Sequence, residues 1–215
     1  MLLIFDWDGT IADSREHIVE AMQRAIDELG WPARSDAQCA ELIGLGLREV
    51  AATLFPALGE SAWADFAAVY SGHFLDLDRR PDTSCLFPAV ATTLAELQRR
   101  GYALAVATGK SRRGLDRVLR ASRLAPYFVA SRAADETASK PSPLMLEELL
   151  QETGYSVDEA VMIGDTHYDM AMAEAIGMTR IAVSYGVHSV AQLSEHKPLC
   201  IVDHFEQLLD CPPLR

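Results

Sequence analysis

Short apolar segments alternate with longer amphipathic segments along most of this 215-residue chain. The apolar segments have the length of fully buried strands and are bounded by glycine, proline or charged residues. This alternation is typical of βαβ units and predicts an α/β fold, with a doubly wound parallel sheet between two layers of helices. The expected strands are residues 2–6, 102–108, 127–130, 160–164, 180–184 and 199–202, and the expected helices are residues 88–100, 111–122, 142–153 and 168–176.

One region interrupts the alternation. Residues 14–85 show helical periodicity and no strand pattern, for example in the spacing of Ile18, Met22 and Leu29. Ser35 and Gln38 have the spacing of a helix capping box, and residues 78–84 are a polar link back to the sheet. We therefore expect an all-α domain of residues 14–85, inserted after the first strand of an α/β core formed by residues 1–13 and 86–215.

The charge balance excludes some classes of partner. Nineteen Lys and Arg residues stand against thirty-one Asp and Glu residues, a net charge of −12. Such a surface repels nucleic-acid backbones and anionic lipids, so we expect neither nucleic acid nor membrane as a partner. No apolar segment approaches the roughly 18 residues of a membrane span. The cysteines are far apart in sequence, and we expect reduced thiols of a cytoplasmic protein at Cys39, Cys85, Cys200 and Cys211.

Pairs of carboxylates follow two of the expected strands. Asp6 and Asp8 follow the first strand, and Asp165 and Asp169 follow the strand at residues 160–164. Open α/β sheets bind ligands at the carboxyl ends of their strands, where side chains from different strands meet. The alternative is an ordinary strand exit with solvated carboxylates, and for Asp169 a helix cap.

Two further groups fall at the same edge of the predicted sheet. Thr108, Gly109 and Lys110 follow a strand, but a P-loop is excluded because Leu104 occupies the position of its first glycine. Lys140 precedes a helix, where a surface lysine is the alternative. Several carboxylates suit a hard divalent cation such as Mg²⁺, and the cation, a lysine and a hydroxyl together suit a phosphate group.

The chain resembles the haloacid dehalogenase-type phosphatases. Four segments resemble that family's motifs in order and separation, and they span residues 6–169: Asp-Trp-Asp-Gly-Thr at 6–10, Thr108-Gly109, Lys140-Pro-Ser-Pro, and Gly164-Asp165 followed by Asp169. The helical insert resembles the α-helical cap of the phosphoglycolate phosphatase type.

The resemblance implies a role for each matching residue. Asp6 would be the nucleophile that forms an aspartyl-phosphate, and Asp8 would protonate the leaving oxygen and then activate water. Thr108, Gly109 and Lys140 would bind the phosphoryl oxygens. Asp169 would orient Lys140 or a metal-bound water.

The resemblance also implies a metal site and a substrate contact. Mg²⁺ would be held by Asp6, the backbone carbonyl of Asp8 and Asp165. The loop of residues 43–48 resembles the loop that such caps lower onto the substrate, and Arg48 would contact a second anionic group there. A solvated arginine is the alternative. We expect Lys110 and His167 to be bystanders.

These features favour a Mg²⁺-dependent phosphatase acting on a small phosphorylated metabolite. A sugar-phosphate mutase with the same four motifs is one alternative. A non-enzymatic, phosphate-responsive regulator resembling receiver domains is another, although those domains are usually near 120 residues and have no helical insert. The motifs identify neither the substrate nor the oligomeric state.

Overall fold

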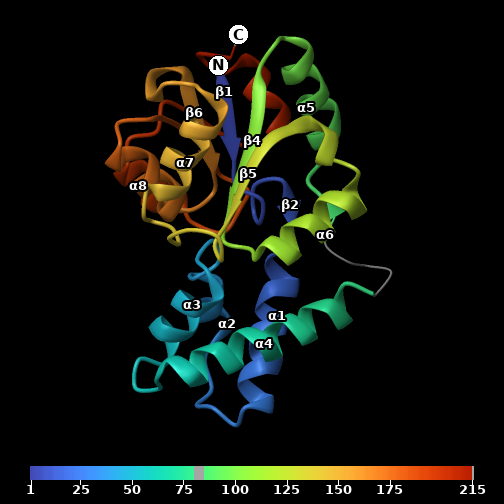
Figure 1. Ribbon diagram of the computed structural model, residues 1–215, viewed down its shortest axis with the longest axis vertical. Helices are drawn as coiled ribbons and strands as arrows, with labels where there is room; N and C mark the ends of the chain where they lie inside the picture. The colour runs from blue at the N-terminus through green and yellow to red at the C-terminus, as the bar shows by residue number, and fades with distance from the viewer. Residues whose placement is uncertain (80–84, 215) are drawn as a thin grey trace.

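A parallel sheet forms the centre of the larger part of the molecule. The computed structural model describes residues 1–79 and 85–214. Its main sheet has the strand order β5-β4-β1-β6-β7-β8, and all of its neighbouring strands are parallel (Figure 1). The strands are β1 (Leu2–Phe5), β4 (Ala103–Thr108), β5 (Phe128–Ala133), β6 (Ala160–Gly164), β7 (Thr179–Val183) and β8 (Ile201–Val202). All six predicted strands are therefore confirmed, with ends that agree within three residues.

Helices cover both faces of this sheet. Helices α5 (Val90–Arg99) and α6 (Arg112–Ser122) pack on one face together with the 3₁₀ helix η3 (Phe205–Asp210), and α7 (Leu144–Thr153) and α8 (His167–Ala175) pack on the other. A further short helix, α9 (Val190–Glu195), was not predicted. The doubly wound α/β prediction is confirmed. The strand order reverses beside β1, which is where sheets of this kind bind ligands.

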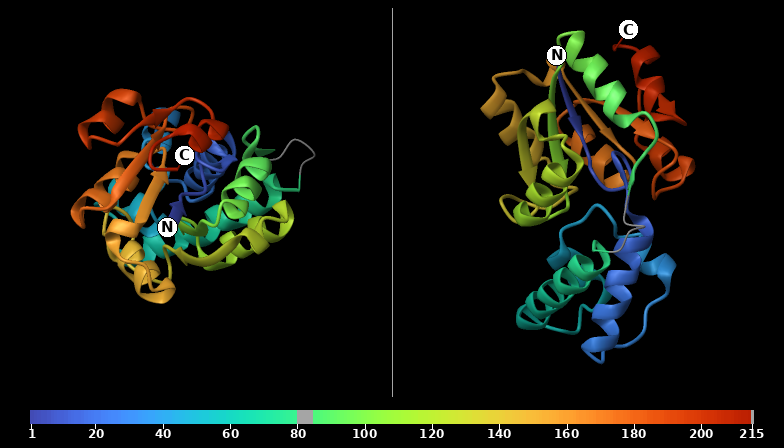
Figure 2. Two further views of the ribbon diagram at one scale, coloured as in Figure 1. Left: turned by 90° about the horizontal axis from the view of Figure 1, so that it is seen from above. Right: turned by 90° about the vertical axis from the view of Figure 1, so that its right-hand side faces the viewer.

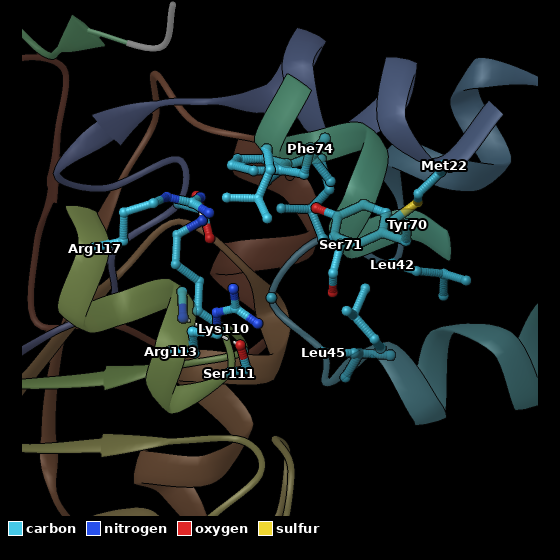
Figure 3. A pocket seen from close by; sticks show the side chains of 18 residues that line it. Met22, Leu42, Leu45, Tyr70, Ser71, Phe74, Lys110, Ser111, Arg113 and Arg117 are labelled. Carbon is cyan, nitrogen blue, oxygen red and sulfur yellow. Dashed lines mark hydrogen bonds and ion pairs between the residues drawn. The ribbon is translucent and has the colours of Figure 1, made fainter. Parts of the chain in front are cut away.

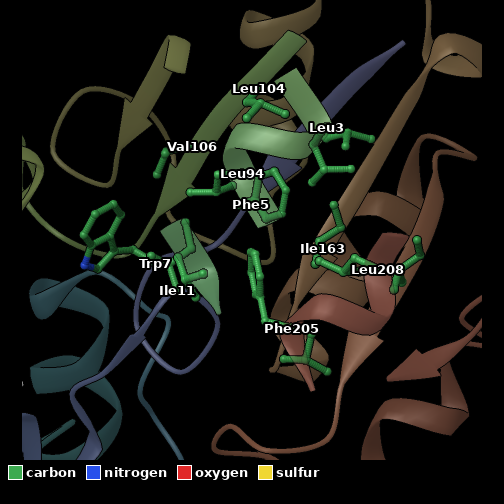
Figure 4. Close-up of a cluster of buried hydrophobic side chains, with 14 of the residues drawn as sticks. Leu3, Phe5, Trp7, Ile11, Leu94, Leu104, Val106, Ile163, Phe205 and Leu208 are labelled. Carbon is green, nitrogen blue, oxygen red and sulfur yellow. The ribbon is translucent and has the colours of Figure 1, made fainter. Parts of the chain in front are cut away.

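The first strand shows why the sheet is buried on both faces. Leu3 and Phe5 pack with Val106 and Ile163 under α5 and η3, in the cluster drawn in Figure 4. Leu2 and Ile4 point to the opposite face and belong to the cluster beneath α7 and α8. Since alternate side chains of a strand point to opposite faces, a continuous apolar run is needed to fill both layers.

The inserted segment forms a separate helical body at one end of the sheet (Figures 1 and 2). It consists of α1 (Arg15–Glu28), α2 (Asp36–Ala40), α3 (Leu47–Leu54) and α4 (Glu60–Leu77), and it has its own hydrophobic cluster. The predicted capping box begins α2: Ser35 Oγ accepts a hydrogen bond from the Gln38 N–H at 3.2 Å, and Gln38 Oε1 accepts one from the Ser35 N–H at 2.9 Å. Most of the predicted link at 78–84 lies outside the described residues.

Helix α4 provides much of the apolar surface of this body. Phe66, Tyr70 and Phe74 repeat every four residues and lie on one buried face, with successive ring centres 6.4 and 5.8 Å apart. These three side chains belong to the hydrophobic cluster of the helical body. None of the helices in residues 1–79 and 85–214 combines the length and apolar character needed to cross a membrane.

A small second sheet closes the base of the insert. Strand β2 (Ala12–Asp13) pairs antiparallel with β3 (Cys85–Leu86), so the chain enters and leaves the helical body at adjacent positions. This pair was not predicted, and the expectation of no strand through residue 85 is corrected at its last residue. Strands of two residues are too short to show an alternating pattern.

The prediction of reduced thiols is wrong for two cysteines. Cys200, next to β8, and Cys211, after η3, form a disulfide across eleven positions of sequence. The fold brings β8 and η3 together, which the linear spacing does not reveal. Cys39 is a buried free thiol, and burial raises its pKa to about 11. The side chain of Cys85 is not among the side chains that the structure describes.

Candidate active site

Asp6 is held in one orientation at the carboxyl end of β1. Its side chain is 1 % exposed, and its Oδ1 lies 2.7 Å from Lys140 Nζ. Its Oδ2 is buried and makes no hydrogen bond with any residue that the structure describes. This is not the solvated carboxylate of an ordinary strand exit. It is an oriented carboxylate with one oxygen free to react or to bind a ligand.

Lys140 is buried among carboxylates, so the surface-lysine alternative is wrong. Its Nζ lies 2.6 Å from Asp169 Oδ1, in addition to its contact with Asp6, and the residue is 1 % exposed. Burial alone would lower the pKa of this lysine, but the charges of Asp169 and Asp6 outweigh that effect and raise its pKa. Lys140 therefore stays positively charged and bridges the first and fourth motifs.

Asp165 and Asp169 are fixed by donors on their own and neighbouring loops. Asp169 Oδ2 accepts hydrogen bonds from the N–H of Thr166 at 3.0 Å and its hydroxyl at 2.7 Å, so the helix-cap alternative for Asp169 is also correct. Asp165 accepts from the Thr10 hydroxyl and from the Val187 N–H, each at 2.8 Å. Thr10 thus links the first motif to the fourth.

The glycine of the first motif allows this close approach. Gly9 has φ +83°, and a Cβ at this position would lie 2.1 Å from Asp165 Oδ2. Any side chain would displace that carboxylate, so the Asp-Gly step at residues 8–9 serves the packing of the site as well as the turn.

The buried charges of this site do not balance. Oxygen atoms of Asp6, Asp165 and Asp169 lie within 4.8 Å of one another, and these three carboxylates face one ammonium, that of Lys140. Burial, together with the neighbouring carboxylates, raises the pKa of Asp6, and burial followed by the charge of Asp169 raises the pKa of Asp165 to about 7. A divalent cation would neutralise the excess charge. The oxygen donors and the free Asp6 Oδ2 fit such a cation.

Asp8 has partners of its own, and one of them was expected to be a bystander. Lys110 Nζ lies 2.9 Å from Asp8 Oδ1, and the Ser14 hydroxyl donates a hydrogen bond to the same oxygen. Neither partner was among the predicted site residues. Lys110 directly follows the Thr108-Gly109 pair, and that adjacency was the available signal.

The second motif forms the floor beneath a loop of the insert. Thr108 is fully buried at the end of β4, and its Oγ1 accepts a hydrogen bond from the Lys110 N–H at 3.2 Å. A Cβ on Gly109 would lie 2.4 Å from the Gly44 carbonyl oxygen. The Gly46 N–H donates to Ser139 Oγ at 2.8 Å. The loop between α2 and α3 therefore rests on the sheet edge where Asp6 and Asp8 lie.

Arg48 is not brought to the other predicted residues. Its guanidinium is exposed, forms ion pairs with Glu60 and with Glu49, and lies 5.7 Å from the centre of the Trp63 ring. These partners belong to α3 and α4 themselves. The expected substrate contact has no support in this arrangement.

A cavity of about 150 Å³ opens beside Asp8, between the insert and α6 (Figure 3). Apolar side chains of α1, α4 and the α2–α3 loop form one side, and Lys110, Arg113 and Arg117 form the other. The sequence pattern does not reveal this cavity, because its walls come from segments far apart in the chain.

Comparison with known proteins gives consistent matches along most of the chain. Residues 3–183 match the family model described as haloacid dehalogenase-like hydrolase. A protein of Dickeya dadantii named "Probable phosphatase IndB" is 34 % identical over 211 residues, which cover 97 % of this chain and 91 % of that protein. A phosphoglycolate phosphatase of Vibrio parahaemolyticus is 29 % identical, with 97 % and 94 % covered. A solved hydrolase of Pseudomonas syringae shares the fold, with a TM-score of 0.87, 21 % identity, and 97 % and 95 % covered.

Proposed function

The chain belongs to the haloacid dehalogenase-like hydrolases and is a phosphatase, and from that premise we propose a Mg²⁺-dependent hydrolysis of a small phosphomonoester through an aspartyl-phosphate. The observation that most supports this proposal is the environment of the Asp6 carboxylate. One of its carboxylate oxygens is held by Lys140, and the other is buried and unpartnered among the described residues. The relatives' names favour hydrolysis over the mutase alternative.

In the first proposed step, Asp6 Oδ2 attacks phosphorus. The P–O bond to the leaving group breaks as Asp8 transfers its proton to the departing oxygen. Lys140 and Thr108 donate to the phosphoryl oxygens as negative charge shifts, since Lys140 is held by Asp6 and Asp169 and Thr108 is buried at the end of β4. Asp169 keeps Lys140 in place through the 2.6 Å contact.

In the second proposed step, Asp8 takes a proton from water as the water oxygen attacks phosphorus. The bond between phosphorus and Asp6 then breaks and releases phosphate. Lys110 and Ser14 keep the Asp8 carboxyl directed toward the cavity in both steps. The same Asp8 therefore serves as acid and then as base.

We assign the metal site to Asp6, the Asp8 backbone carbonyl and Asp165, with Asp169 nearby. The charge excess of the buried carboxylates over Lys140 supports this assignment. A bound Mg²⁺ would supply positive charge against the phosphoryl oxygens and the Asp6 carboxylate.

Three broader parts of the proposal rest on the sequence. We keep residues 14–85 as a cap domain over a core of residues 1–13 and 86–215, supported by the separate hydrophobic cluster of α1–α4. The partner is a small phosphorylated metabolite, as the names of the relatives suggest. A cytoplasmic location remains our prediction, and the Cys200–Cys211 disulfide is the observation that weighs against it.

Hydrolysis of p-nitrophenyl phosphate by purified protein tests the proposal. We expect release of phosphate with Mg²⁺, its loss in excess EDTA, and recovery on adding Mg²⁺ back. Asp6→Asn should be inactive under every condition. Full turnover by metal-free protein would contradict the metal requirement, and an active Asp6→Asn would contradict the nucleophile.

A further inference from the structure

The cavity beside Asp8 has the size and lining of a binding site for an apolar ring. Its volume is about 150 Å³, and an apolar protein cavity of about that volume holds benzene. Met22, Leu42, Leu45 and Phe74 contribute apolar side chains on the side of the insert (Figure 3). Asp8 also lines the cavity, so a leaving group whose oxygen Asp8 would protonate can extend into it.

The cations of the opposite wall are largely neutralised. Lys110 is paired with Asp8, and Arg117 is paired with Asp78, each at 2.9 Å. Both cations also lie over the ring of Phe74, at 4.8 and 5.3 Å from its centre. Arg113 has no ion pair with any residue in the described part of the chain, but it is exposed. While Asp8 is ionised, no buried cation of the cavity is unpaired among the described residues; while Asp8 carries the proton for the leaving group, Lys110 loses that partner.

One polar group of the cavity lacks a partner. Tyr70 lines the cavity and is 9 % exposed, and its hydroxyl makes no hydrogen bond with any residue that the structure describes. Figure 3 shows this hydroxyl on the side of the ring that faces Arg117 and Lys110. Burial, and then the negative charge of Asp8, raise the pKa of Tyr70. The phenol is therefore a hydrogen-bond donor at neutral pH, and it is available to an acceptor that enters the cavity.

Building on the phosphatase activity proposed above, we propose that the substrate's leaving group is a compact apolar ring that carries a hydrogen-bond acceptor. The ring occupies the cavity against Phe74 and Met22, and the Tyr70 hydroxyl donates to the acceptor. Tyr70 thereby determines specificity. A two-carbon leaving group such as glycolate would leave most of the cavity unfilled.

A matched series of primary-alcohol esters tests the proposal: ethyl phosphate, benzyl phosphate, the three pyridinylmethyl phosphates and 2-phosphoglycolate. Benzyl phosphate should exceed ethyl phosphate and 2-phosphoglycolate in kcat/KM by roughly 10- to 100-fold, because its ring is removed from water. The best pyridinylmethyl isomer should exceed benzyl phosphate by about 3- to 10-fold, the effect of one hydrogen bond.

Two variants separate the hydroxyl from the rest of the cavity. Tyr70→Phe should abolish the advantage of the pyridine ring and keep the preference for benzyl over ethyl phosphate. Tyr155→Phe makes the same chemical change at a residue that packs against the cluster under α7 and α8, and it should change neither preference. The kcat/KM ratio of two esters is compared between wild type and each variant, so the difference in leaving-group acidity, which is the same in both proteins, cancels.

The possible failures are distinguishable. Comparable kcat/KM for ethyl, benzyl and glycolate esters would overturn the ring site and leave the phosphatase proposal intact. A pyridine advantage that persists in Tyr70→Phe would overturn the role of Tyr70. Hydrolysis of none of these esters or of p-nitrophenyl phosphate, with Mg²⁺ present, would overturn the proposed function and the ring site with it.

Discussion

Replacing Lys140 by Met should destabilise the protein strongly, because the change removes the cation that bridges two buried carboxylates. Lys140 Nζ lies 2.7 Å from Asp6 and 2.6 Å from Asp169, and all three side chains are at most 1 % exposed. Breaking a buried ion pair by removing one partner costs about 3–5 kcal/mol. The two contacts share one ammonium, so we expect a loss in that range and not twice that range. Urea unfolding of metal-free protein at pH 8, followed by circular dichroism, measures it.

The destabilisation caused by Lys140→Met should increase as the pH rises. A carboxyl whose pKa is higher in the folded than in the unfolded protein stabilises the fold when protonated, and that contribution is lost as pH rises through the folded pKa. Burial already raises the pKa of Asp6 well above its usual value and that of Asp165 to about 7, and removing Lys140 raises both further. The destabilisation should therefore be largest above pH 7 and shrink toward pH 5.

A matched control completes this test. Lys197 is exposed, and Lys197→Met should change the free energy of unfolding by no more than about 0.5 kcal/mol at any pH. A Lys140→Met protein within about 1 kcal/mol of wild type at pH 8, with an unchanged pH profile, would refute the reasoning about the buried charge cluster.

Three further changes have specific expected outcomes. The Mg²⁺ affinity of wild-type protein, measured by calorimetry, should rise with pH through about 7, because Asp165 must lose its proton before it can bind the metal. A flat profile would contradict that role. Gly109→Ala should lower kcat/KM on the order of a hundredfold, because the new Cβ would lie 2.4 Å from the Gly44 carbonyl and displace the loop over the site. Gly72→Ala, on an open face of α4, should leave kcat/KM unchanged. Arg48→Ala should also leave kcat/KM unchanged, since its partners are exposed glutamates of the insert, and a selective rise in KM would restore the substrate contact expected from the sequence.

The sheet was predictable because its strands need apolar residues on both faces. Leu2 to Phe5 contribute two side chains to each layer, and such a run leaves few alternatives in a chain of this length. In a parallel sheet the carboxyl ends of the strands meet at one edge of the sheet. The sequence alone was therefore enough to group Asp6, Asp165 and Lys140. The capping box at Ser35 was predictable because its hydrogen bonds are local.

Features that depend on long-range side-chain direction were not predictable. Lys110 reaches Asp8, and Tyr70 faces the same cavity from α4, but nothing in their local sequence indicates either contact. The disulfide between Cys200 and Cys211 depends on the packing of η3 beside β8. Tyr70 lies on the buried face of α4, but helical periodicity cannot show that its hydroxyl lacks a partner among the described residues.

The most direct test of the central claim is the intact mass of the protein after mixing with p-nitrophenyl phosphate and Mg²⁺ and quenching in acid. Asp8→Asn keeps the Asp6 nucleophile and loses the base for water, so it should accumulate more of the single-phosphate adduct than wild type. Asp6→Asn should show none. An adduct of equal size in Asp6→Asn would mean that another residue is the nucleophile and would contradict the assignment of Asp6.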